Sequence, residues 1–217
     1  ASQLEPEAPH YSLVAFLVFS QISVGAFAGA LCAELLGAET LAGWLGVVGS
    51  GIAHLSLLGT LFHLGRPVHA LKAIRAWRRS WLSREVVVFS AYAGLAVVGP
   101  SIFLIEQFAD VFPPLQPIQR LLIHTLPASA VAAAHAATVL TGTLGIYCSA
   151  RIYLLPARPA WDSWRTLAQF FTTALTGGAA LAATLLLICD AASATLVVTI
   201  GLLLAGASLF SAMLPWT

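Results

Sequence analysis

The sequence predicts an all-α integral membrane protein, a bundle of about six transmembrane helices. Of its 217 residues, 59% are hydrophobic and only 9% are charged, whereas about a quarter of the residues in soluble domains are charged. The apolar residues gather in runs of about 20, the length a helix needs to cross a bilayer. These runs lack the polar face of a soluble amphipathic helix and the alternation of a membrane β-strand. We therefore expect one transmembrane domain over residues 1–217.

Six apolar runs supply the predicted spans. They cover about residues 12–35, 41–64, 84–105, 128–153, 166–188 and 193–214. The first run follows Glu5 and Glu7 rather than basic residues, so it does not resemble a secretory signal.

The connection between the second and third spans is predicted to contain an interfacial helix. Gly65 suits the end of the second helix, and Pro67 suits the first position of a new one. Leu71, Ile74 and Trp77 then recur at helical spacing with basic residues between them. This pattern is typical of an amphipathic helix that lies at the membrane surface and contacts lipid or another subunit.

Basic residues are expected at one end of the bundle. If six spans alternate, the amino terminus, the 2–3 and 4–5 connections and the carboxyl terminus share one face, which then holds nine of the ten cations. The positive-inside rule places both termini and the basic loops in the cytoplasm, and Arg120 alone would lie opposite. The nine are Arg66, Lys72, Arg75, Arg78, Arg79, Arg84, Arg151, Arg158 and Arg165.

The start of the third span carries polar groups where the chain enters the membrane. We expect Ser83 to be the N-cap of this span and Glu85 to fall in its first turn, where an anion suits the helix dipole. His63, at the basic end of the second span, would lie at a similar depth. Ionisable groups at such positions are candidates for function.

A histidine, an arginine and a carboxylate at this depth suit a quinone head group. A neutral histidine can donate a hydrogen bond to a quinone carbonyl and exchange protons near pH 7. A carboxylate such as Glu85 can relay protons to the aqueous face. From the residues alone, a solvated His63 and a surface pair of Arg84 with Glu85 remain alternatives.

The cysteines give no sign of a metal centre. Cys32, Cys148 and Cys189 lie far apart in apolar runs, and an iron–sulfur cluster normally needs four thiolates. The sequence also lacks a zinc motif and a Gly-rich phosphate loop. We expect no iron–sulfur cluster in this chain and no nucleic-acid partner.

Two stretches resemble the membrane-anchor subunits of the dimethyl sulfoxide reductase family. The first runs from His63 to Pro67 with Ala70, and continues as residues 80–85 (SWLSRE). The second joins residues 151–153 (RIY) to residues 159–163 (PAWDS). The resemblance extends over essentially the whole chain.

The resemblance implies an integral-membrane subunit of a three-part complex in a prokaryotic inner membrane. A molybdopterin catalytic subunit and a four-cluster iron–sulfur subunit would complete the complex, which would be dimethyl sulfoxide reductase-like or sulfite dehydrogenase-like. The anchor would exchange electrons with quinone or quinol (menaquinone or ubiquinone), without haem. The resemblance associates His63 with quinol binding. The other site residues are assigned from their predicted positions at the basic end of the spans. The quinone-binding residues are His63, Arg66, Arg84 and Glu85, and the partner-docking residues are Lys72, Arg75, Arg78, Arg79, Arg151, Arg158 and Arg165.

Other classes of membrane protein remain as alternatives. A b-type cytochrome subunit would use histidine pairs: His54 and His135 both lie near mid-membrane, and His124 and His135 would share a helical face. Gln21 in the first span could bond a ligand, although packing is its simpler role. A small transporter or a purely structural anchor is a further alternative. A transporter should show broken spans at matching places in two halves, and the sequence shows no such pattern.

Overall fold

The computed structural model describes residues 11–61, 74–127, 129–158, 161–189 and 206, and all its regular structure there is helical. Five helical stretches are long and apolar enough to cross a membrane, which confirms the predicted fold class and the first five predicted spans. Of the sixth predicted span, residues 193–214, the structure describes only residue 206. The long helices are α1 (Tyr11–Leu35), α2 (Glu39–Leu61), α4 (Trp81–Ala96) continuing as α5 (Val98–Phe108), α7 (Ala130–Tyr153) and α8 (Trp164–Cys189).

The third span is broken near its middle, which the sequence analysis did not predict. The helix stops at Ala96, and a new one begins at Val98. Pro100 stands four residues after Ala96 and has no N–H to donate to that carbonyl, and its ring crowds the preceding turn. The proline therefore accounts for the division between α4 and α5.

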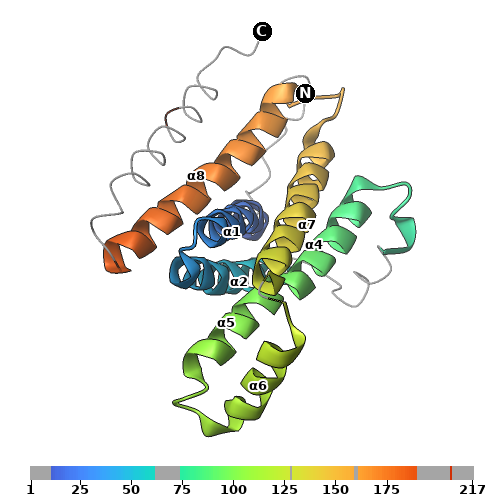
Figure 1. The fold of residues 1–217 in the computed structure, drawn as a ribbon. Helices are drawn as coiled ribbons and strands as arrows, with labels where there is room; N and C mark the ends of the chain where they lie inside the picture. The colour runs from blue at the N-terminus through green and yellow to red at the C-terminus, as the bar shows by residue number, and fades with distance from the viewer. Residues whose placement is uncertain (1–10, 62–73, 128, 159–160, 190–205, 207–217) are drawn as a thin grey trace.

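Helix α1 is the centre of the bundle. It packs against α2, α7 and α8, while α4 packs along α7 (Figure 1). The buried core forms around Phe27 of α1, with Phe89 and Tyr92 of α4 and Ile146 of α7. Large apolar side chains also cover the outer faces of these helices, as expected where lipid replaces water.

Small residues allow α1 and α8 to approach very closely. A Cβ atom added to Gly25 would lie 1.8 Å from the carbonyl oxygen of Ala174, and one added to Gly178 would lie 2.2 Å from the Gly25 backbone. Such close backbone contact replaces the hydrophobic effect as a source of helix association in membranes, because lipid is as apolar as the helices themselves.

A buried polar link joins three helices inside the bundle. Ser23 of α1 donates a 2.7 Å hydrogen bond to the carbonyl of Gly49 on α2. The Tyr92 hydroxyl of α4 lies 2.6 Å from the same serine oxygen and donates to it, since the serine proton is already used. Tyr92 and Ser23 are both fully buried, so the link fixes the relative depth of α1, α2 and α4.

Two short surface segments complete the described fold. The connection after α2 is described only from residue 74, where η2 (Ile74–Ala76) forms one 3₁₀ turn; the rest of the predicted interfacial helix lies outside the described residues. Between α5 and α7, η3 (Pro113–Leu115) leads into the exposed helix α6 (Gln116–Thr125).

Most of the described charges of each sign gather at one end of the bundle, with Arg120, Glu85 and Asp162 as exceptions. The end formed by the start of α4, the end of α7 and the start of α8 carries Arg75, Arg84, Arg151 and Arg165, among other arginines. At the opposite end, Glu34 lies within electrostatic range of Glu39 and Glu106. We call these the basic end and the acidic end. Which end faces the cytoplasm remains a prediction.

Candidate functional site

The basic end is built on the first turn of α4, which begins earlier than predicted. Ser80, not Ser83, is the N-cap: it has extended dihedral angles (φ −123°, ψ 129°), and its side chain accepts from the N–H of Ser83 at 3.5 Å. The prediction of Ser83 as the cap was therefore wrong. Because the helix starts at Trp81, Glu85 lies in the second turn and faces the bundle instead of the first-turn amides.

The carboxyl group of Glu85 is buried at this end. The residue is only 7% exposed, and Ser149 of α7 donates a hydrogen bond from its hydroxyl to Oε1. Arg84 and Glu85 do not form the surface pair that the sequence left open as an alternative, because the side chains take different directions. A carboxyl group held inside a membrane protein, close to the aqueous end, has the position of a proton acceptor or donor.

Arg84 holds the chain just before α4. Its Nε donates a 2.9 Å hydrogen bond to the carbonyl of Trp77, and Nη2 donates a 2.9 Å bond to the carbonyl of Arg78. Its guanidinium also lies 4.2 Å from the centroid of the Trp81 ring. Arg84 therefore fixes the path by which the connection enters the third span, and much of its hydrogen-bonding capacity is already used.

Trp81 brings the two distinctive stretches of the sequence together. Arg151, from the end of α7, lies 4.9 Å from the centroid of the same ring. Tyr147, one helical turn earlier on α7, makes an edge contact with Trp81 at 5.9 Å. Residues 80–85 and 151–153, far apart in sequence, thus form one cluster. Arg84 was assigned to quinone and Arg151 to docking, but the structure places both on Trp81.

The second stretch continues this cluster toward α8. Tyr153 packs against Trp161 at 5.6 Å and against Phe170 of α8 at 5.7 Å. Arg158 lies 4.7 Å from the Trp161 ring centroid. These contacts fold the connection after α7 back over the basic end.

The predicted docking residues are mostly on the surface. Arg75, Arg78, Arg79 and Arg158 are exposed, whereas Arg151 and Arg165 are partly buried. Three residues that the sequence singled out, His63, Arg66 and Lys72, lie outside the described residues. The docking assignment and the position of His63 relative to Glu85 stay predictions.

Ser149 and Tyr147 were not singled out by the sequence analysis, and Trp81 was quoted only as part of residues 80–85 without being given a role. Ser149 had a detectable signal, because it is a polar residue in an apolar run only two positions before Arg151. Its partner could not be read from the sequence, since Glu85 is 64 residues away. Tyr147 carried no signal beyond that of an ordinary interface anchor.

The histidines that favoured a cytochrome take separate positions. His124 lies on exposed α6 and His135 on α7, so they do not share a helical face as predicted; Pro127 separates the two helices. His135 is 1% exposed and fits against glycines: a Cβ added to Gly99 would lie 2.9 Å from its Nε2. His54 is 2.8 Å from the carbonyl of Ser50 through Nδ1. Within the described ranges, no three His, Cys, Asp or Glu residues gather as a metal site.

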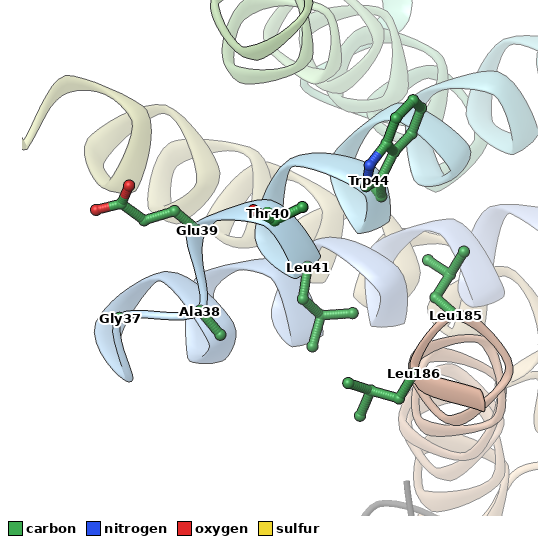
Figure 2. A pocket seen from close by; sticks show the side chains of 8 residues that line it. All are labelled: Gly37, Ala38, Glu39, Thr40, Leu41, Trp44, Leu185 and Leu186. Atoms are coloured by element: carbon green, nitrogen blue, oxygen red, sulfur yellow. The ribbon is translucent and has the colours of Figure 1, made fainter. Parts of the chain in front are cut away.

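A pocket of about 350 Å³ lies at the acidic end, away from the Glu85 cluster. Figure 2 shows Leu41 and Trp44 of α2 on one side and Leu185 and Leu186 of α8 on the other. Residues 37–40, between α1 and the first turn of α2, complete the lining. None of the predicted site residues lines it. Gln21, the other candidate ligand residue, is buried in α1 at 5% exposure.

Comparison with known proteins connects these features to one family. The sequence model of the DMSO reductase anchor subunit (DmsC) family matches residues 6–214. The chain is also 56% identical over 45 residues to a subunit of the sulfite dehydrogenase of Allochromatium vinosum, a match covering 19% of this chain and 14% of that protein. No solved structure matches the chain. The family match covers nearly the whole chain, which therefore belongs to the DMSO reductase anchor subunits, the membrane anchors of DMSO reductase-type complexes.

Proposed function

We propose that this anchor exchanges electrons with quinone and passes them to or from an iron–sulfur subunit that serves a molybdopterin catalytic subunit. The observation that carries the proposal is the buried Glu85 carboxyl, which accepts from Ser149 beside the basic end. Burying a carboxyl group inside a membrane protein costs free energy even when it accepts a hydrogen bond, and a purely structural anchor would gain nothing from that cost at this place.

The chain's own residues would handle the protons of the reaction. Oxidation of a quinol to a quinone releases two electrons and two protons; the electrons leave to the iron–sulfur partner, and reduction reverses every step. We propose that His63 donates a hydrogen bond to a quinone carbonyl and exchanges one proton, and that Glu85 exchanges the other with water at the basic end. Ser149 orients the Glu85 carboxyl, and Arg84 holds the adjoining connection in place.

Docking would use the same end of the molecule. The exposed guanidinium groups of Arg75, Arg78, Arg79 and Arg158 form a cationic surface that suits an acidic partner. Lys72, Arg66 and Arg165 would add to this charge. The excess of cations supports placing the basic end in the cytoplasm, with the iron–sulfur subunit beside the quinone site.

The direction of electron flow is proposed from the short curated match. The protein that aligns with 45 residues of this chain is named as part of a sulfite dehydrogenase. A dehydrogenase oxidises its substrate and passes the electrons to an acceptor. By analogy, this anchor would deliver electrons from its partner subunits to quinone.

Replacing His63 tests the quinone proposal. In the assembled complex, we expect His63→Ala to lower quinone-linked turnover by about 10²-fold, because a general acid–base group contributes 10²–10⁴-fold. Turnover with a soluble dye supplied to the partner subunits should stay unchanged. His124→Ala is the matched control, because His124 is exposed on α6, on the other side of the break at Pro127. Intact quinone turnover in assembled His63→Ala complex would overturn the proposal for this residue.

A further inference from the structure

We propose that the outer face of α4 and α7 binds one anionic phospholipid, whose phosphate lies against Arg151 and Arg84. Nothing in the quinone and docking roles requires this site. Two features of described residues carry the inference: a pair of guanidinium groups gathered on one tryptophan, and an apolar stripe that leads to them.

The guanidinium pair has unused capacity for an anion. Arg84 and Arg151 lie 4.2 and 4.9 Å from the Trp81 ring centroid. The Nε of Arg151 is buried and has no hydrogen-bond partner among the described residues, whereas the residue as a whole is partly exposed. Arg84 donates to two neutral carbonyls, which leave its charge uncancelled. A buried donor without a partner is costly, and a phosphate oxygen is the acceptor that an arginine fork fits best.

The apolar stripe runs from this pair toward the middle of the membrane. Leu140, Leu144, Tyr147 and Arg151 are spaced by four, three and four residues, so they lie on one face of α7. Leu140 is 67% exposed and Leu144 is 55% exposed. Tyr147 contacts Trp81 at the end of the stripe that is nearest Arg151. The face is therefore a continuous apolar surface that ends at two cations.

The length of the stripe matches one leaflet. Eleven residues separate Leu140 from Arg151, which is about 16 Å along a helix. Half of the hydrocarbon core is about 15 Å thick. An acyl chain lying on Leu144 and Leu140 would thus place its phosphate at the level of Arg151. Basic groups between membrane helices at this level are known binding places for anionic head groups. A quinone head group is neutral and would leave the two charges unmatched.

Native mass spectrometry of the full-length chain in detergent tests the site directly. The chain is incubated with phosphatidylglycerol or with phosphatidylethanolamine of the same acyl chains. We expect one retained phosphatidylglycerol, and about fivefold lower retention in Arg151→Gln, because one cation at the surface contributes about that factor. Arg151→Lys should keep most of the retention, since it keeps the charge.

A matched control exists at the same end of the molecule. Arg158 lies on the Trp161 ring at 4.7 Å, much as Arg151 lies on Trp81, but it is exposed and lies beyond the end of α7. Arg158→Gln removes the same charge and should change retention by less than about twofold. If Arg151→Gln fails to accumulate, Leu144→Gln provides a second test: a polar side chain on the stripe should lower retention without altering a cation.

Four results would overturn the proposal. The first is equal retention of the two lipids, and the second is an equal loss of retention in Arg158→Gln and Arg151→Gln. The third is retention of inorganic phosphate alone to the same extent as phosphatidylglycerol. The fourth is displacement of the bound lipid by stoichiometric quinone. The second would indicate diffuse attraction to the basic end, and the last would assign the face to the quinone. Retention specific to phosphatidylglycerol and lost with Arg151 or Leu144 would support the site.

Discussion

At the scale of single residues, the neighbours Arg84 and Glu85 point in different directions and make different contacts. Arg84 reaches out to the carbonyls of Trp77 and Arg78, while Glu85 faces the bundle and accepts from Ser149. About 100° of helix rotation separates them, which is enough to place one at the surface and the other inside. The buried carboxyl depends on a single described side-chain donor, so Ser149 is its positioning residue.

Ser149→Ala tests this dependence. Loss of the hydroxyl leaves Glu85 without its donor, and a buried polar group that loses its partner costs about 1–3 kcal/mol. We expect a lower unfolding temperature in detergent and an altered pH profile of quinone-linked turnover, with dye-linked turnover unchanged. Ser90→Ala is the control, because the Ser90 hydroxyl is exposed on α4 and bonds only its own helix at Val86. Equal pH profiles in wild type and Ser149→Ala would show that Ser149 does not tune Glu85.

At the scale of helices, tight contacts between backbones set the arrangement. The carbonyl of Ala174 lies where a side chain on Gly25 would begin, and Gly178 faces the same glycine. Because van der Waals packing holds membrane helices together, the crossing of α1 and α8 depends on the absence of a Cβ atom at this point.

Gly25→Ala should therefore separate α1 from α8. The added Cβ atom would lie 1.8 Å from a carbonyl oxygen of α8, and overpacking of this kind costs about 1–3 kcal/mol or more. Gly51→Ala, also inside a helix, meets nothing within 4 Å and should leave stability unchanged or slightly raised. Reversible unfolding in mixed micelles can compare the two. Equal stabilities would mean that α8 shifts freely on α1.

The sequence predicted the helices better than their junctions. Runs of apolar residues located five described spans because the bilayer fixes helix length. The sequence did not show that Ser80, and not Ser83, is the N-cap of α4. Both serines precede the same apolar run, and only the path of the connection decides between them. It also missed the break at Val97, although Pro100 could have indicated it. The contact of Glu85 with Ser149 depends on how α4 and α7 align, which no local pattern encodes.

At the scale of the whole molecule, charge divides the bundle into two unlike ends. Glu34, Glu39 and Glu106 lie together at one end, whereas the described arginines of the 2–3 and 4–5 connections lie at the other. These are Arg75, Arg78, Arg79 and Arg158. The buried carboxyl of Glu85 also belongs to the basic end, with Trp81 and the aromatic cluster around Tyr153. A partner bound at this end would lie next to the proposed quinone site, to which Glu85 belongs. The path for electrons between the quinone and the partner would then be short.

Reversing the charge of the basic connection should release the soluble subunits. Lys72, Arg75 and Arg79 are changed together to Glu, and inverted membrane vesicles, whose cytoplasmic face is outward, are washed and assayed. Like charges across an interface cost several kcal/mol, so we expect retention of the iron–sulfur subunit to fall by roughly 100-fold. Arg120→Glu, on exposed α6 away from the basic end, should retain it. If the triple variant retains its partners, docking occurs elsewhere. If even wild-type inverted vesicles enclose the subunits, the basic end faces away from the cytoplasm, and partner binding rather than topology accounts for its charge.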